Sequence, residues 1–179
     1  MEIISTLLNF NVLQHRLGKL IDGDYLLHGS KYHDLEILLP HYSFNKLYRG
    51  KNINALYATN DIITAAFYAV FDKRKGRGSS VFEKLTTEEG IKYRFNIEKS
   101  IVESSPFHSG YIYIVKKRNF SCIENDNYQS RTWCSLNPVV PLAKIEVNYK
   151  DFLSQANLTF QGALFCYEFQ INYERTDFW

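Results

Sequence analysis

Cysteine, proline and methionine are scarce in this sequence of 179 residues, which contains three Cys, four Pro and one Met. The cysteines, Cys122, Cys134 and Cys166, lie too far apart for a CxxC metal or redox motif. An odd, scattered set of this kind does not suit a disulfide framework. We therefore expect reduced thiols and a cytoplasmic protein.

Long apolar runs and an excess of one charge are also missing. No stretch approaches the 18 or more consecutive apolar residues of a membrane-spanning helix. Residues 1–20 lack the basic start and continuous apolar centre of a secretory signal. Lys and Arg number 21 against 19 Asp and Glu, for a net charge of +2. This balance excludes a strongly basic nucleic-acid coat and an acidic tail protein, and we expect no membrane partner.

Several motifs of common enzyme classes do not occur. The sequence contains no P-loop, no Gly-x-Gly-x-x-Gly dinucleotide fingerprint and no Gly-x-Ser-x-Gly nucleophile elbow. His28, His33 and His41 are spaced five and eight residues apart, without the cysteines or repeated carboxylates of a zinc site. The sequence therefore predicts no resident metal.

Aromatic residues, in contrast, are abundant: they make up 16% of the chain, with 13 Tyr and 13 Phe. Apolar residues amount to 45%, a globular proportion that can form a sizeable core. The length suits one domain, which we predict over residues 1–179.

Hydrophobic periodicity predicts two helices and a series of strands. Apolar residues at steps of three and four predict a helix over 2–18, within an N-terminal region 1–20. A second helix follows an N-cap at Thr59, Asn60 or Asp61, and residues 31–54 are predicted to be a long loop. Alternation and short apolar runs predict strands at 25–28, 55–58, 91–97, 111–115, 120–123, 132–135, 143–147 and 164–173. This order predicts an α+β fold.

Two predicted strand ends carry the most informative residues. The first ends in His28-Gly29-Ser30, and the second contains Tyr57-Ala58-Thr59 and is followed by a helix with Tyr68. In this the sequence resembles the ADP-ribosyltransferase superfamily, in the branch with a His-Tyr-acid triad that includes poly-ADP-ribose polymerases and rifampin ADP-ribosyltransferases. The resemblance covers residues 25–150 and implies a single-domain split β-sheet, mixed or antiparallel, with flanking helices.

The resemblance also implies a role for each matching residue in binding NAD as the substrate. His28 would bind the adenine-side ribose, and Ser30 completes its motif. The backbone of Gly29 would pair with the nicotinamide amide, where the missing Cβ would let the ligand approach closely. Tyr57 and Tyr68 would enclose the nicotinamide ring between them.

Catalysis in this superfamily also uses a carboxylate on the third strand, which stabilises the positive charge that develops on the ribose. Thr132 stands where that acid normally stands, so this sequence departs from the family pattern. Glu124, with Asp126 and Gln129, lies just upstream. Glu124 and Thr132 are therefore the candidate catalytic positions.

The resemblance implies an NAD-dependent mono-ADP-ribosyltransferase that modifies a protein, a nucleic acid or a small molecule. The basic clusters 73–77 and 116–118 keep a nucleic-acid acceptor open, although we favour a protein. The alternative is a binding or interaction module of the same fold without turnover, which the Thr132 departure favours. An RNA 2′-phosphotransferase is disfavoured, because Tyr57 stands where that group has a histidine.

By analogy of fold, such a domain would suit a bacterial or phage toxin or effector in its own or a host cytoplasm. The region 158–179 lies outside the resemblance, and we expect it to add a strand.

Overall fold

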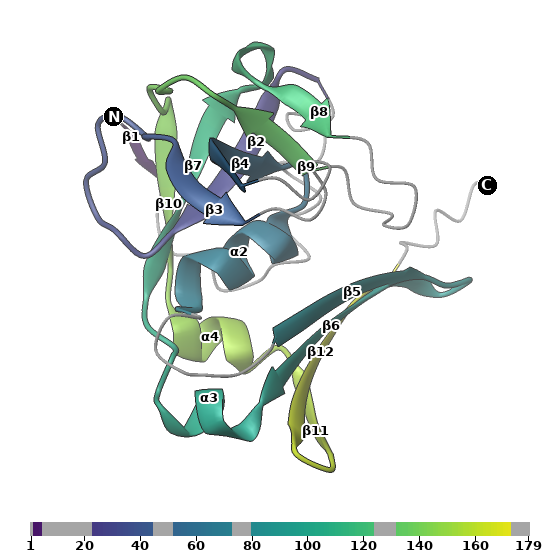
Figure 1. The fold of residues 1–179 in the computed structure, drawn as a ribbon. Coiled ribbons are helices and arrows are strands. Elements are labelled where there is room, and N and C mark those ends of the chain that lie inside the picture. The colour runs from purple at the N-terminus through teal and green to yellow at the C-terminus, as the bar shows by residue number, and fades with distance from the viewer. Residues whose placement is uncertain (1, 5–22, 45–51, 73–79, 124–131, 173–179) are drawn as a thin grey trace, which may run out of the picture. The chain divides into compact units, whose positions relative to one another are not determined.

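The computed structural model describes residues 2–4, 23–44, 52–72, 80–123 and 132–172 (Figure 1). It has an α+β fold of mostly antiparallel strands in two sheets with few helices, which confirms the predicted α+β class. The split β-sheet that the resemblance implies stays a prediction. The chain forms two compact units, Met1–Asp72 with Phe107–Asp151 and Lys73–Pro106 with Phe152–Trp179. A single domain over 1–179 stays a prediction.

The first unit contains an eight-stranded sheet in the order β1-β10-β7-β2-β4-β9-β8, and β3 also pairs with β4. Among the described strands of this sheet, β1 and β10 are the parallel pair, and the other neighbours are antiparallel. The strands are β1 (Glu2–Ile4), β2 (Tyr25–Ser30), β3 (His41–Phe44), β4 (Asn52–Thr59), β7 (Gly110–Lys116), β8 (Ser121–Ile123), β9 (Thr132–Ser135) and β10 (Ala143–Val147).

Helix α2 (Ile62–Val70) packs against β2, β7 and β4 (Figure 1). It begins at Asp61, whose carboxylate accepts a hydrogen bond of 2.9 Å from the Thr64 N–H, so the predicted cap is Asp61. Every residue of the helix except Tyr68 is buried. A helix this enclosed is held by tertiary packing rather than by its own propensity.

The contact between α2 and the sheet is unusually close because small residues meet there. A Cβ atom added to Gly29 would lie 2.0 Å from the carbonyl oxygen of Ala65, and one added to Gly110 would lie 2.0 Å from that of Ala69. Real Cβ atoms do not come that close to backbone. Glycine on the strands and alanine on the helix therefore let the backbones of α2, β2 and β7 approach one another.

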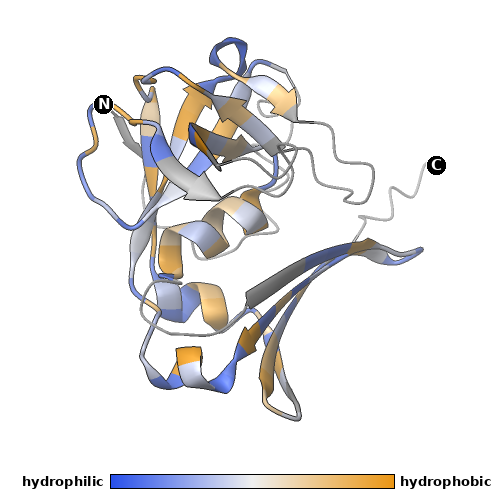
Figure 2. Cartoon of the chain, in the orientation of Figure 1, coloured by the Kyte–Doolittle hydropathy of each residue, from blue (hydrophilic) through white to orange (hydrophobic). Residues whose placement is uncertain are grey.

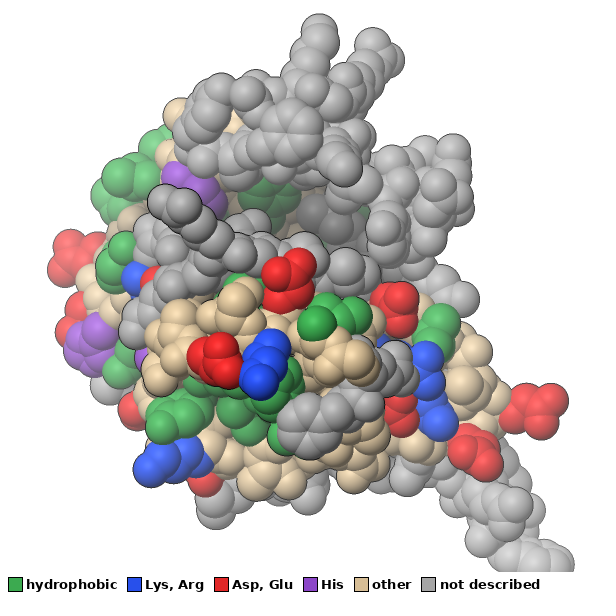
Figure 3. Space-filling model, turned by 60° about the horizontal axis from the view of Figure 1, so that its bottom comes forward, with side chains coloured by type: hydrophobic (Ala, Val, Ile, Leu, Met, Phe, Trp, Pro, Cys, Tyr) green, Lys and Arg blue, Asp and Glu red, His purple; other side chains and the backbone are tan. Residues whose placement is uncertain are grey.

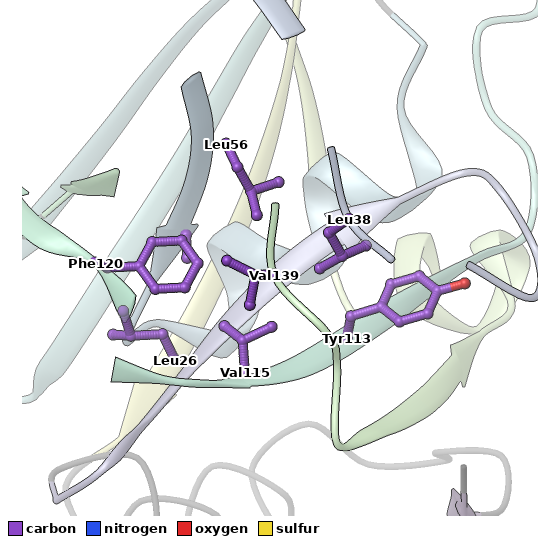
Figure 4. Packing of buried hydrophobic residues seen from close by; sticks show 8 residues of the cluster. Leu26, Leu38, Leu56, Tyr113, Val115, Phe120 and Val139 are labelled. Carbon is purple, nitrogen blue, oxygen red and sulfur yellow. The ribbon is translucent and has the colours of Figure 1, made fainter. Parts of the chain in front are cut away.

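A hydrophobic cluster covers the sheet on the side of Leu26, Leu56 and Tyr113 (Figure 4). Leu38 and Val139, from two different loops, complete it through a pair of backbone hydrogen bonds of 2.8 and 2.9 Å. Figure 2 shows hydrophobic colouring along the central strands of this sheet. Because Leu26 and His28 are two residues apart on β2, their side chains point to the same side of the sheet.

The second unit contains a four-stranded antiparallel sheet in the order β11-β12-β6-β5. Its core consists of alternate residues of β6 together with Phe152 and Phe169, whose rings stack at 4.5 Å. Its elements are β5 (Ser80–Thr86), β6 (Gly90–Glu98), α3 (Lys99–Glu103), β11 (Asn157–Gln161) and β12 (Leu164–Asn172). The short helices η2 (Lys117–Asn119) and α4 (Tyr149–Leu153) complete the described chain.

Two predictions of secondary structure are wrong. The helix over 2–18 fails at Glu2–Ile4, which form β1 because their backbone groups pair with the edge of β10; residues 5–18 lie outside the described residues. The long loop over 31–54 fails at His41–Phe44, which form β3 by pairing with the first half of β4. The partner of β1 is distant in the sequence and the partner of β3 is the next strand, and local periodicity reveals neither pairing.

The C-terminal region adds two strands, β11 and β12, where one was expected. No helix in the described ranges combines the length and the apolar character needed to cross a membrane.

Candidate functional site

Strands β2 and β4 separate from each other after a single cross-strand pair, Leu27 with Thr59. Further back along β4, Ala55 pairs with His41 of β3. Between these two pairs, β4 has no described neighbour on this side, where β2 would otherwise continue. We call this gap in the pairing the β2–β4 opening.

The backbone of Gly29 faces the β2–β4 opening. Lys117 N–H donates to the Asp24 carbonyl oxygen at 2.8 Å, and along an antiparallel ladder every second pair is hydrogen-bonded in this way. The register between β2 and β7 runs without interruption from Tyr25 to Ser30. The N–H and C=O groups of Leu27 and Gly29 therefore point away from β7. Those of Leu27 meet Thr59, and the described strand pairing of β2 with β4 does not extend to Gly29.

His28 links the two strands where they separate. Its Nδ1 lies 2.7 Å from the carbonyl oxygen of Tyr57. Because a carbonyl oxygen only accepts, Nδ1 carries the proton and donates it. Burial lowers the pKa of His28, the bond to Tyr57 raises it less, and the nearby His41 lowers it further. At neutral pH the ring is therefore uncharged, and its Nε2 is a hydrogen-bond acceptor without a partner among the described residues.

Tyr57 contributes a ring and an unpaired hydroxyl. The side chain packs against Ala55 and Cys134, and its hydroxyl oxygen is buried with no hydrogen-bond partner in the described part of the chain. A buried hydroxyl in that state costs free energy. His28 and Tyr57, predicted as partners in one site, are therefore joined through the His28 ring and the Tyr57 backbone carbonyl. The Tyr57 side chain leaves β4 on the side of the sheet opposite to Leu56 and His28.

Tyr68 lies on α2 and exposes 50% of its surface. Its ring meets the edge of Phe67 at 5.8 Å. Enough protein surrounds the phenol to raise its pKa through desolvation, although half of the side chain reaches solvent. The proposed sandwich needs space between Tyr57 and Tyr68 for a ligand ring, and it stays a prediction.

The position predicted for the acid lies beside the β2–β4 opening. Thr132, the first residue of β9, pairs with Thr59 on one side and with Ile123 of β8 on the other. Leu27, which pairs with Thr59, completes this cross-strand row, beyond which β2 and β4 separate. Glu124 follows Ile123 in the chain and lies outside the described residues.

The remaining motif residue, Ser30, ends β2. Its hydroxyl oxygen accepts a hydrogen bond of 3.2 Å from the Tyr32 N–H, which starts the turn into the next loop. The missing Cβ of Gly29 makes room for the backbone of α2, so the fold itself requires glycine here. The expected close approach of a ligand to the Gly29 backbone stays a prediction.

Sequence reasoning missed Tyr113 of β7, the residue paired with His28. It is fully buried, and its hydroxyl bonds to the backbone of the loop that follows Ser30. The alternation in 111–115 predicts a strand, but it does not predict that the Tyr113 hydroxyl forms hydrogen bonds with the loop after Ser30. The sequence offers no role for His41 beyond a zinc-site spacing that it does not meet, whereas in the structure His41 is near enough to His28 to lower its pKa. In the described part of the chain no three His, Cys, Asp or Glu side chains gather into a metal site.

Comparisons of the chain with family models, curated proteins and solved structures found no match.

Proposed function

We propose that the chain binds NAD in the β2–β4 opening and transfers ADP-ribose from it to an acceptor. The observation that carries this proposal is the hydrogen bond from His28 to the Tyr57 carbonyl at the point where β2 and β4 separate. It leaves a neutral acceptor nitrogen at a gap in the sheet that the backbone of Gly29 faces and that the Tyr57 residue borders. The resemblance in His28-Gly29-Ser30 and Tyr57 gives this arrangement its ligand.

Each group has a complementary part of NAD. The Nε2 of His28 can accept a hydrogen bond from a ribose hydroxyl. The N–H and C=O of Gly29 together match a primary carboxamide, which needs one acceptor and one donor. The rings of Tyr57 and Tyr68 offer flat apolar faces for nicotinamide.

The proposed reaction breaks the bond between the nicotinamide nitrogen and the ribose. The electron pair of that bond leaves with nicotinamide, and positive charge develops on the ribose carbon that held it. A nucleophilic atom of the acceptor then bonds to this carbon, and the acceptor loses its proton. A carboxylate beside the ribose would stabilise the charge. Glu124 is our candidate for this carboxylate, because it follows directly the residue that pairs with Thr132.

The second candidate function is a module that binds NAD or ADP-ribose without turnover. The observation that favours it is Thr132, a residue without charge in the cross-strand row that borders the opening. For the transferase, we propose a protein acceptor rather than a nucleic acid. Among the described side chains on the face shown in Figure 3, lysine and arginine are interspersed with aspartate and glutamate.

Two measurements on the purified chain test these proposals. NAD at 100 times its dissociation constant should stabilise the fold by about 2.7 kcal/mol, which a thermal melt detects. Nicotinamide release from labelled NAD, with and without a cell extract, then separates the candidates, with His28→Ala as the control for the site.

Release that requires both the extract and His28 supports the transferase. Release without the extract indicates hydrolysis, with water as the acceptor. A melting shift without release supports the binding module. Neither a shift nor release, or a shift that survives in His28→Ala, overturns the site.

A further inference from the structure

The loop that leaves the candidate site, residues 31–35, is fastened to the sheet by one side chain. The hydroxyl of Tyr113 donates a hydrogen bond of 2.8 Å to the Tyr32 carbonyl oxygen and accepts one of 3.1 Å from the Leu35 N–H. One phenol group thus satisfies two backbone groups on either side of the turn. We call this segment the 31–35 loop.

Tyr113 reaches the loop from directly beside His28. The two residues are partners in the register of β2 and β7, so their side chains leave neighbouring backbones on the same side of the sheet. Figure 4 shows the Tyr113 ring at the edge of the hydrophobic cluster, with its hydroxyl directed away from the aliphatic side chains. The ring belongs to the core, whereas both described hydrogen bonds of the hydroxyl go to the 31–35 loop.

A second contact holds the tip of the loop. Asp34 has a φ of +53°, in the left-handed region, and its carboxylate forms an ion pair with the buried ammonium group of Lys144. That ammonium group also lies 5.1 Å from the centre of the Tyr111 ring, against which His33 packs edge-on at 4.9 Å. The loop is therefore fixed at both its backbone and its tip.

We propose that Tyr113 is a positioning residue of the candidate site, which it serves by holding the 31–35 loop at the open end of β2. The inference rests on the proposed NAD binding. His28 and Gly29 contact the ligand in that proposal, and Ser30 and Lys31 continue from them into the loop. The two hydrogen bonds of Tyr113 keep residues 30–35 in one conformation. Binding of NAD then does not have to include the entropic cost of ordering this segment.

The substitution Tyr113→Phe separates this role from core packing, because it keeps the buried ring and removes only the hydroxyl. The matched control is Tyr93→Phe, at a fully buried tyrosine of the other compact unit. KM for NAD and kcat come from nicotinamide release, and calorimetric dissociation constants for NAD replace them if wild type binds without turnover. Amide hydrogen exchange without ligand reports on Leu35.

We expect Tyr113→Phe to raise KM, or the dissociation constant, about 10-fold while kcat changes less than about twofold. Amide exchange at Leu35 should accelerate. Tyr93→Phe should leave the KM for NAD, or the dissociation constant, and the exchange rate at Leu35 at their wild-type values. An unchanged KM in Tyr113→Phe, or an equal rise in both variants, overturns the inference and leaves the proposed function standing. Wild type that neither binds nor cleaves NAD overturns the proposed function, and the inference with it.

Discussion

His28 donates its Nδ1 proton to the carbonyl oxygen of Tyr57 across the point where β2 and β4 stop pairing. If the pairing of β2 with β4 continued beyond Leu27 and Thr59, the next hydrogen-bonded pair would be Gly29 with Tyr57. The imidazole takes the place of that backbone bond, so the strands stay connected while the gap between them stays open. In the proposed function the two ring nitrogens have separate tasks, Nδ1 toward the sheet and Nε2 toward NAD.

Substitutions that imitate one nitrogen at a time should separate these tasks. The amide nitrogen of asparagine stands as many bonds from Cα as Nδ1, so His28→Asn can keep the link to Tyr57 but lacks an acceptor at Nε2. We expect the free energy of unfolding of this variant to lie within about 1 kcal/mol of wild type, and NAD no longer to raise its melting temperature. His28→Gln reaches the Nε2 position instead, and should lose stability while it keeps part of the shift. The reverse pattern would contradict the assigned roles.

The lowered pKa of His28 predicts how binding depends on pH. Burial disfavours the charged ring, so the folded chain takes up this proton less readily than the unfolded chain. The contribution of His28 to stability is complete above the usual histidine pKa of about 6.5 and is lost as the pH falls through its lower folded-state pKa. NAD binding should be constant from pH 8 to about 6.5 and should weaken in acid as Nε2 becomes protonated. Calorimetric titrations at a series of pH values test this, and His28→Gln, which does not titrate, should lack the acid decline.

The close approach of α2 to β2 and β7 predicts which glycines are indispensable. Gly29→Ala and Gly110→Ala should each destabilise the fold by about 3 kcal/mol, because the new methyl group meets a helix carbonyl at 2.0 Å. Gly162→Ala is the control: it has φ +62° but no atom within 4 Å of the added Cβ, and should cost about 1–2 kcal/mol. Denaturant unfolding measures all three. Equal losses would contradict the steric explanation.

The unpaired hydroxyl of Tyr57 predicts that Tyr57→Phe is neutral or stabilising by up to about 1 kcal/mol, since it removes a buried polar group that forms no described hydrogen bond. The ring remains, so the NAD-induced melting shift should persist. Tyr57→Ala removes the ring face and should abolish the shift. A marked loss of stability in Tyr57→Phe would mean that the hydroxyl has a partner outside the described residues.

Thr132 and Glu124 predict opposite results for the two candidate functions. If Glu124 is the acid, Glu124→Gln should lower nicotinamide release by about 10²-fold or more, and Thr132→Glu should add little. If the chain is a binding module, wild type should release none, and Thr132→Glu should introduce release while the NAD-induced shift stays. Initial rates with labelled NAD distinguish the two patterns, with Thr132→Gln as the uncharged control.

Most strands of the first unit could be predicted, because β2, β7 and β10 have buried, β-branched or aromatic residues in short runs bounded by turn residues. Helix α2 was predictable from its cap and its apolar spacing. Strand β1 could not be predicted, since it is defined by its pairing with β10, which is distant in the sequence. Strand β3 pairs with the neighbouring β4, and the mixed polar and aromatic composition of its four residues gives no sign of a strand.

The candidate site was predictable only in part. The resemblance brought His28 and Tyr57 together, and the structure joins them through a backbone carbonyl that no motif specifies. Tyr113 could not be found, because its importance depends on the sheet register and on a loop 78 residues away. Residues that act through hydrogen bonds to distant backbone have no characteristic spacing in the sequence.

The packing at Gly29 has a consequence for how descendants of such a chain could change. Selection for folding alone would preserve this glycine, because α2 occupies the volume that any larger residue needs. Glycine at this position in a related sequence would therefore indicate that a helix packs closely on the strand, and would not by itself indicate a bound ligand. His28, whose side chain faces away from α2, carries no such packing constraint.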